Sequence, residues 1–120
     1  MADRNTPPLT PAGFQVLLAL AGGAAHGYGV MRFVEEISDG TVRLGPGTLY
    51  RTLQRLVADG LVAEVASESE DPHDARRRYY ELTDLGRTAA TQEAELLSRL
   101  VAVATDTGLL GRPSSRTRSA

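Results

Sequence analysis

The 120-residue sequence contains no cysteine and no lysine. Without cysteine, the chain cannot form disulfides, use a cysteine nucleophile or bind a metal ion through thiolates. It also lacks any run of about 18 uncharged apolar residues, so no membrane-spanning helix is predicted. The amino-terminal residues do not show the basic-then-apolar order of a signal peptide, and we therefore expect a cytoplasmic protein.

The overall charge does not favour a nucleic-acid partner. Thirteen basic residues, all arginine, stand against 15 acidic residues, which gives a net charge of −2 and a pI near 5.6, whereas nucleic-acid-binding domains are usually basic. However, residues 41–63 and 76–78 together hold six arginines and one acid, whereas residues 64–74 and 79–106 together hold ten acids and two arginines. Arginine suits bidentate contacts with guanine and phosphate, although an arginine-biased genome explains its exclusive use equally well.

Hydrophobic periodicity and capping residues predict one small domain of four helices and a β-hairpin. The predicted helices lie between Thr10 and Gly22, from about Gly27 to Ile37, between Gly45 and Gly60, and between Thr83 and Gly108. The predicted strands are residues 41–44, 61–65 and 77–82. This order is typical of a winged helix-turn-helix domain, in which the third helix enters the major groove of DNA and the hairpin flanks it.

We therefore expect a mainly α fold with a small β-hairpin wing, namely a winged helix-turn-helix plus a C-terminal dimerisation helix. The expected parts are a flexible arm (1–8), the DNA-binding domain (9–82), the dimerisation helix (83–108) and a disordered tail (109–120).

The third predicted helix has one apolar and one polar face. Leu49, Leu53 and Leu56 recur at helical spacing and form the predicted core stripe. The opposite face bears Thr48, Arg51, Gln54 and Arg55 and no carboxylate. Arginine pairs with guanine, glutamine with adenine, and threonine contacts bases or the thymine methyl group. This face is predicted to contact DNA bases, with an ordinary solvated helix face as the alternative.

A second basic segment lies on the returning strand of the hairpin. Arg76, Arg77 and Arg78 precede two tyrosines and are suited to phosphate contacts, although strand alternation prevents all three from facing DNA together. We also expect Arg43 to bind phosphate and Tyr50 to lie where the protein meets the DNA backbone. Alternatively, the wing arginines pair with the acids of the hairpin tip. These acids are Glu68, Glu70, Asp71 and Asp74.

Other kinds of site have little support in the sequence. Asp71, His73 and Asp74 form a short cluster that is more typical of a polar turn than of a metal site. No serine lies in a recognisable catalytic motif, and Gly45-Pro46-Gly47 lacks the further glycine and the lysine of a phosphate-binding loop. We therefore expect no enzyme activity, no metal and no cofactor.

The last predicted helix carries two neighbouring apolar lines. One contains Leu96, Leu100 and Val103, and the other contains Leu97, Val101 and Ala104. A small domain covers one such line, and the second would stay exposed, as at an interface. We expect this helix to form a homodimer; the alternative is that it packs wholly on its own domain.

Four motifs in order carry a family resemblance. They are His26-Gly27-Tyr28-Gly29, Gly45-Pro46-Gly47-Thr48-Leu49-Tyr50-Arg51-Thr52-Leu53-Gln54-Arg55-Leu56, Asp59-Gly60-Leu61-Val62 and Arg77-Arg78-Tyr79-Tyr80-Glu81-Leu82-Thr83-Asp84-Leu85-Gly86. Over roughly residues 9–105 the sequence resembles the PadR family of transcriptional regulators. The resemblance places Thr48, Tyr50 and Arg51 in the recognition helix and Arg76 to Arg78 at the wing.

The resemblance also implies a homodimeric repressor that binds a near-palindromic operator in double-stranded DNA. It implies release by a small aromatic or hydrophobic effector, for which we expect a cleft between protomers lined by the first and last helices. The alternative is a winged-helix module that binds proteins and has lost DNA binding, and the acidic pI favours it.

Overall fold

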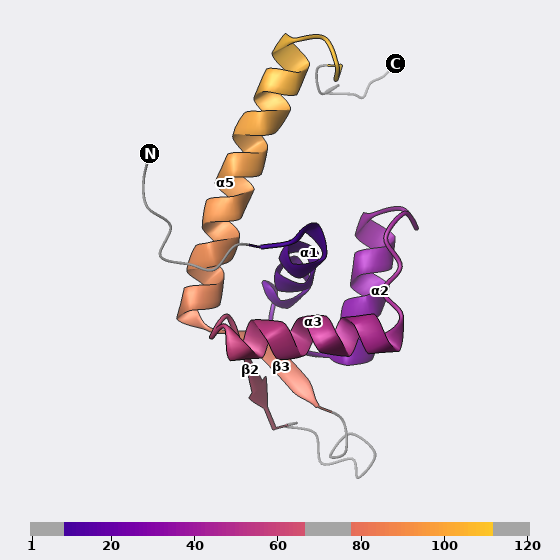
Figure 1. Ribbon diagram of the computed structural model, residues 1–120, viewed down its shortest axis with the longest axis vertical. Coiled ribbons are helices and arrows are strands. Elements are labelled where there is room, and N and C mark those ends of the chain that lie inside the picture. The colour runs from indigo at the N-terminus through magenta and orange to yellow at the C-terminus, as the bar shows by residue number, and fades with distance from the viewer. Residues whose placement is uncertain (1–8, 67–77, 112–120) are drawn as a thin grey trace.

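The computed structural model of the protein describes residues 9–66 and 78–111, which form four helices and three short strands (Figure 1). The elements are α1 (Pro11–Leu20), β1 (Ala25–His26), α2 (Gly27–Ile37), α3 (Pro46–Ala58), β2 (Val62–Val65), β3 (Tyr79–Leu82) and α5 (Asp84–Asp106). The predicted arm (1–8), the hairpin tip with Arg76 and Arg77, and most of the predicted tail lie outside the described residues.

Local side-chain caps set where three of the helices begin. Thr10 Oγ1 accepts a hydrogen bond from the Gly13 N–H at 2.9 Å, His26 Nδ1 accepts one from the Gly29 N–H at 3.1 Å, and Thr83 Oγ1 accepts one from the Gly86 N–H at 2.9 Å. Each cap satisfies one of the backbone donors left free at a helix start. The helix α3 lacks a side-chain cap and begins instead with proline after Gly45. The predicted starts and ends of the first three helices are therefore confirmed to within about two residues.

The strands form a three-stranded antiparallel sheet in the order β1-β3-β2. His26 pairs with Tyr79, and Glu64 pairs with Tyr80. The prediction of a strand at residues 41–44 was wrong, because the third strand is Ala25–His26. The Val42 N–H donates to the Ser38 hydroxyl at 3.0 Å instead of to a strand, and Val42 packs against the core.

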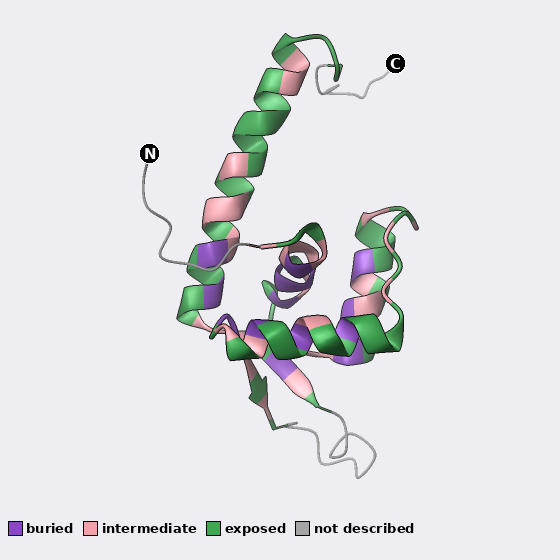
Figure 2. Ribbon diagram, viewed as in Figure 1, coloured by how far each residue is buried: buried purple, intermediate pink, exposed green. Residues whose placement is uncertain are grey.

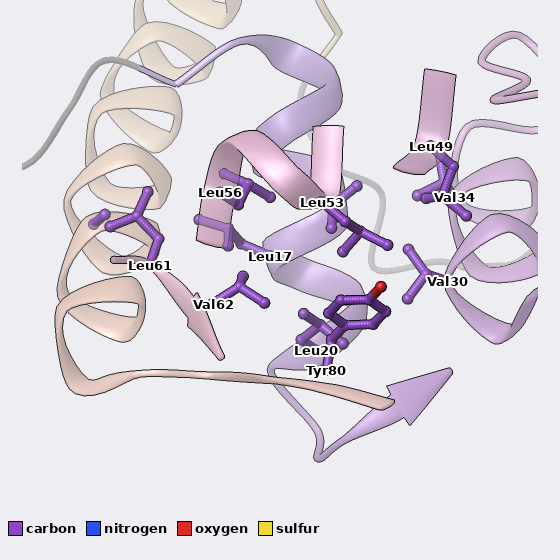
Figure 3. Packing of buried hydrophobic residues seen from close by; sticks show 12 residues of the cluster. Leu17, Leu20, Val30, Val34, Leu49, Leu53, Leu56, Leu61, Val62 and Tyr80 are labelled. Atoms are coloured by element: carbon purple, nitrogen blue, oxygen red, sulfur yellow. The ribbon is translucent and has the colours of Figure 1, made fainter. Parts of the chain in front are cut away.

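The core lies where α1, α2 and α3 meet the sheet and the start of α5 (Figures 2 and 3). Its buried side chains are Val16, Leu17, Leu20, Val30, Val34, Leu49, Leu53, Leu56, Leu61, Val62, Tyr80 and Ala89. The spacing of Val30, Val34 and Ile37 predicts one buried stripe on α2, which is correct for the two valines and wrong for Ile37. As the last residue of this helix, Ile37 lies beyond the core and is exposed.

The helix α5 leaves the domain soon after it begins (Figure 1). Its buried residues are Gly86 and Ala89, in its first two turns. The prediction that the domain covers one apolar line of this helix was wrong, since Leu100 and Val103 on one line and Val101 on the other are each at least half exposed. Figure 2 shows no buried residue in the distal half of α5, so packing of the whole helix on its own domain is also wrong.

Candidate nucleic-acid interface

The structure places the predicted base-contacting residues on one exposed surface of α3. Leu49, Leu53 and Leu56 are buried on the opposite side and fix the rotation of the helix about its axis. The exposed residues are Thr48, Tyr50, Arg51, Gln54 and Arg55, and we refer to them as the outer face of α3. The first carboxylate of this segment is Asp59, immediately after the helix.

The two arginines of the outer face are held by weak local contacts. Arg51 Nη2 donates to Thr48 Oγ1 at 3.2 Å, and Arg55 Nε lies 3.4 Å from Asp59 Oδ2. The Arg55 side chain is 79% exposed, so this ion pair contributes at most about 1 kcal/mol to stability. A stronger anionic partner can therefore replace these contacts at little cost.

Two further arginines predicted to bind phosphate also carry exposed ion pairs. Arg43 Nε lies 3.5 Å from Glu35 Oε2, and Arg78 Nη1 donates to Glu64 Oε2 at 3.0 Å. Glu64 belongs to β2, so the acid that Arg78 contacts is on the neighbouring strand and is not one of the predicted tip acids. Arg76, Arg77 and the tip acids lie outside the described residues.

Tyr50 makes a contact that sequence reasoning missed. Its hydroxyl lies over Gly27 at the start of α2, where a Cβ atom would come within 2.7 Å of the Tyr50 Oη. Tyr50 thus braces α3 against the first turn of α2, while 44% of its surface stays exposed. Gly27 and Tyr50 each belong to one of the family motifs, but the sequence does not indicate that these two residues are in contact.

The described residues show little that would support metal or membrane chemistry. Within residues 9–66 and 78–111, no three His, Asp or Glu side chains come close enough together to hold a metal ion. The short cluster Asp71, His73 and Asp74 lies outside these ranges. Among the same residues, no helix has the length and apolar character needed to cross a membrane.

Comparison with known proteins gives a consistent assignment. The sequence model of the transcriptional regulator PadR-like family matches residues 16–92. The chain is 42% identical over 66 residues to the transcriptional regulator Rv3488 of Mycobacterium tuberculosis, which covers 55% of this chain and 59% of that protein. It is 40% identical over 85 residues to an uncharacterized 37.1 kDa protein in transposon TN4556 of Streptomyces fradiae, covering 71% of this chain and 22% of that protein. The chain thus spans less than two thirds of either relative.

The fold is also found among solved structures. A PadR family transcription regulator from hypervirulent Clostridium difficile R20291 superposes with a TM-score of 0.67 at 19% identity, covering 82% of this chain and 98% of that one. This likeness confirms the predicted mainly helical fold with its small antiparallel sheet, and the family match covers more than half of the chain. The chain belongs to the PadR-like family of transcriptional regulators.

Proposed function

We propose that the protein is a homodimeric transcriptional repressor that binds a near-palindromic operator in double-stranded DNA. The observation that carries this proposal is the outer face of α3. It presents two arginines and a glutamine on a helix whose other side is anchored in the core. Arginine and glutamine are the side chains best suited to bidentate contacts with guanine and adenine in the major groove.

In this proposal, the residues of the outer face and the neighbouring arginines make two kinds of DNA contact: some contact bases and the others contact the sugar-phosphate backbone. Thr48, Arg51, Gln54 and Arg55 contact bases, because they project from α3 away from the core. Tyr50, Arg43 and the wing arginines Arg76, Arg77 and Arg78 contact the sugar-phosphate backbone, which sets the position of the protein without specifying sequence. The ion pairs of Arg43 and Arg78 are exposed and are replaced by phosphate on binding.

The proposed homodimer forms through α5. Leu96, Leu97, Leu100, Val101 and Val103 lie on this helix, and four of the five are exposed in the protomer. Burying each such side chain contributes about 1.5–3 kcal/mol, and an extended exposed apolar surface is typical of an interface. A twofold dimer presents two copies of α3, which fit successive major grooves when they lie about 34 Å apart.

The remaining parts of the proposal rest on the family alone. Residues 9–82 form the DNA-binding domain and 83–108 the dimerisation helix, the protein acts in the cytoplasm, and a small aromatic or hydrophobic effector releases it from the operator.

Electrophoretic mobility shift with the promoter of its own or a neighbouring gene tests the proposal. Arg51→Ala and Arg55→Ala should each weaken operator binding about 10-fold and reduce the preference over unrelated DNA. Arg87→Ala, an exposed arginine on α5 away from the outer face, serves as the matched control and should bind normally. If both outer-face variants keep wild-type affinity and sequence preference, the assignment of α3 is wrong.

Loss of a phosphate contact has a different signature. Arg78→Ala should weaken binding to all sequences alike and reduce the slope of log K against log salt by about one. A change of sequence preference in this variant would place Arg78 at the bases instead.

A protein-interaction module without DNA binding is the second candidate, favoured by the net charge of −2. Absence of salt-dependent binding to any duplex, together with a stable protein partner in a pull-down, would support it over the repressor.

A further inference from the structure

The strands β2 and β3 bring a carboxylate, a guanidinium and a buried hydroxyl close together. Glu64 of β2 pairs directly with Tyr80 of β3, and the side chains of two directly paired residues lie on the same face of an antiparallel sheet. Arg78, immediately before β3, donates from Nη1 to Glu64 Oε2 at 3.0 Å. Glu64 is therefore the common neighbour of an arginine and a tyrosine.

The tyrosine of this group has a hydroxyl that the fold leaves without a partner. Tyr80 is fully buried, and its hydroxyl has no hydrogen-bond partner in the part of the chain that the structure describes. In Figure 3 it carries the single oxygen among the side chains of the core cluster. A buried hydroxyl without a partner destabilises the fold, and native proteins rarely retain one. Its presence here therefore needs an explanation.

The nearby acceptor for this hydroxyl is the Glu64 carboxylate. Burial raises the pKa of Tyr80, and the negative charge of Glu64 raises it further. Since the interaction of two charges weakens with their separation, a carboxylate with this effect lies near the hydroxyl. In the free protein, however, the carboxylate is bonded to Arg78 and not to Tyr80. Glu64 thus has two neighbouring donors and bonds to one of them.

The same arginine belongs to the surface that is proposed to meet DNA. Arg78 and Tyr80 line a hollow of about 640 Å3 together with residues that include Tyr50 and Gln54 of the outer face of α3. The Arg78 side chain is 65% exposed, and the proposed function assigns it to phosphate. When Arg78 moves to a phosphate, Glu64 loses its ion pair and is left as a carboxylate close to the DNA backbone, which repels it. A second donor for Glu64 would reduce this cost.

We propose that Glu64 exchanges partners when the protein binds DNA: its carboxylate leaves Arg78, which turns to a phosphate, and accepts a hydrogen bond from the Tyr80 hydroxyl instead. Glu64 and Tyr80 are positioning residues, which act on DNA through Arg78 without touching it. The exposed ion pair that is lost is weak, whereas a hydrogen bond from a buried hydroxyl to a carboxylate is stronger. The exchange on DNA rests on the proposed function, whereas the ability of Glu64 to bond to either donor does not.

Thermal unfolding of the full-length protein tests the two donors of Glu64 without DNA. In Arg78→Ala the carboxylate is free to bond to Tyr80, so adding Tyr80→Phe should lower the Tm by about 4–8 °C, as expected for one lost hydrogen bond in a small domain. In the wild-type background Tyr80→Phe should not lower the Tm, because the hydroxyl has no partner in the described residues. Arg87→Ala is the matched background, and there too Tyr80→Phe should not lower the Tm. If Tyr80→Phe has the same effect in all three backgrounds, the proposal is wrong.

A double-mutant cycle in DNA affinity tests the exchange on DNA. The probe is a labelled duplex of the promoter of the protein's own gene, and its binding is followed by fluorescence anisotropy. Tyr80→Phe should weaken binding about 5- to 10-fold, because the hydrogen bond from its hydroxyl is made only in the complex. In a Glu64→Ala background the same change should have no effect, since no carboxylate remains to accept. Equal weakening with and without Glu64 would place the hydroxyl on the DNA itself and overturn the exchange, as would no weakening at all.

Two comparisons separate the exchange from general effects and from the proposed function. Tyr79→Phe removes the neighbouring hydroxyl of β3, outside the hollow, and should leave duplex affinity unchanged. With Arg78 present, Glu64 and Tyr80 should be coupled in duplex affinity but not in the Tm, a difference that a purely structural role of Tyr80 does not produce. If the wild type binds no duplex, the proposed function fails and the exchange on DNA with it, while the unfolding experiment still decides whether Glu64 bonds to either donor.

Discussion

Among the glycines, Gly86 leaves the least room for a side chain, because α5 begins there against Leu61, the residue that precedes β2. A Cβ atom on Gly86 would lie 1.9 Å from the carbonyl oxygen of Leu61 and 2.9 Å from its carbonyl carbon. Real Cβ contacts essentially never fall below 3.0 Å, so the two segments would have to separate by about 1.1 Å. Neither segment is the flexible end of a side chain that could move aside.

The same junction is held by hydrogen bonds that such a shift would strain. The Thr83 N–H donates to the Leu61 carbonyl at 3.1 Å, and the Thr83 hydroxyl donates to the Gly60 carbonyl at 2.6 Å. Overpacking typically costs about 1–3 kcal/mol, and each weakened hydrogen bond adds about 1 kcal/mol. We therefore expect Gly86→Ala to lower the free energy of unfolding by about 3 kcal/mol, which corresponds to a Tm lower by roughly 10–20 °C.

Thermal and urea unfolding followed by circular dichroism measures this loss. Gly22→Ala provides the matched control, because Gly22 is exposed and a Cβ atom there would meet nothing within 4 Å. The control should change stability by less than about 0.5 kcal/mol. A Gly86→Ala protein that melts within about 2 °C of wild type would show that α5 does not approach Leu61 this closely, and the packing argument would be refuted.

Three further predictions follow from single side chains. Tyr80→Phe should leave stability at neutral pH unchanged or raise it by about 1 kcal/mol, because the lost hydroxyl has no partner within hydrogen-bonding distance among the described residues and interacts with the Glu64 carboxylate only from farther away. Burial raises the pKa of Tyr80 above its ordinary value of 10.0, so the native state retains a proton that the unfolded state releases. Stability of the wild type should therefore fall as the pH rises above 10, and urea unfolding should show a smaller fall in the variant. His26→Ala should cost about 1 kcal/mol by removing the cap on the Gly29 N–H, and His26→Asn should restore most of it in thermal unfolding. Leu100→Asp should yield a folded monomer in light scattering, since this side chain is exposed in the protomer; a dimer that persists would place the interface elsewhere.

Much of the helical part of the fold could be predicted, because its determinants are local in sequence. Thr10, Pro11 and Gly60 mark helix starts and ends through their own hydrogen bonds and backbone preferences. The leucine spacing in residues 46–58 likewise fixed which side of α3 faces outward. Each of these signals needs only neighbours within one or two turns.

The parts that depend on distant partners could not be predicted in the same way. Residues 41–44 have β-prone side chains, yet β3 pairs with Ala25 and His26, and the choice between two possible partners depends on the packed core. Tyr28 at the start of α2, Tyr50 on α3 and Tyr80 on β3 line one common hollow, and no periodicity in the sequence reveals that they are close. The exposure of α5 was underestimated because the sequence shows an apolar surface but not how far the domain reaches along it.

The contact at Gly86 has a geometric consequence for the whole assembly. The helix that starts there has 23 residues and is therefore about 34 Å long, and its buried residues, Gly86 and Ala89, lie in its first two turns. A tilt of this helix by about 5° at its contact with the Leu61 carbonyl displaces its far end by about 3 Å over this length. In the proposed dimer, the fit of two backbone segments at one glycine thus controls the span between two recognition helices, and with it which spacing of half-sites the protein accepts.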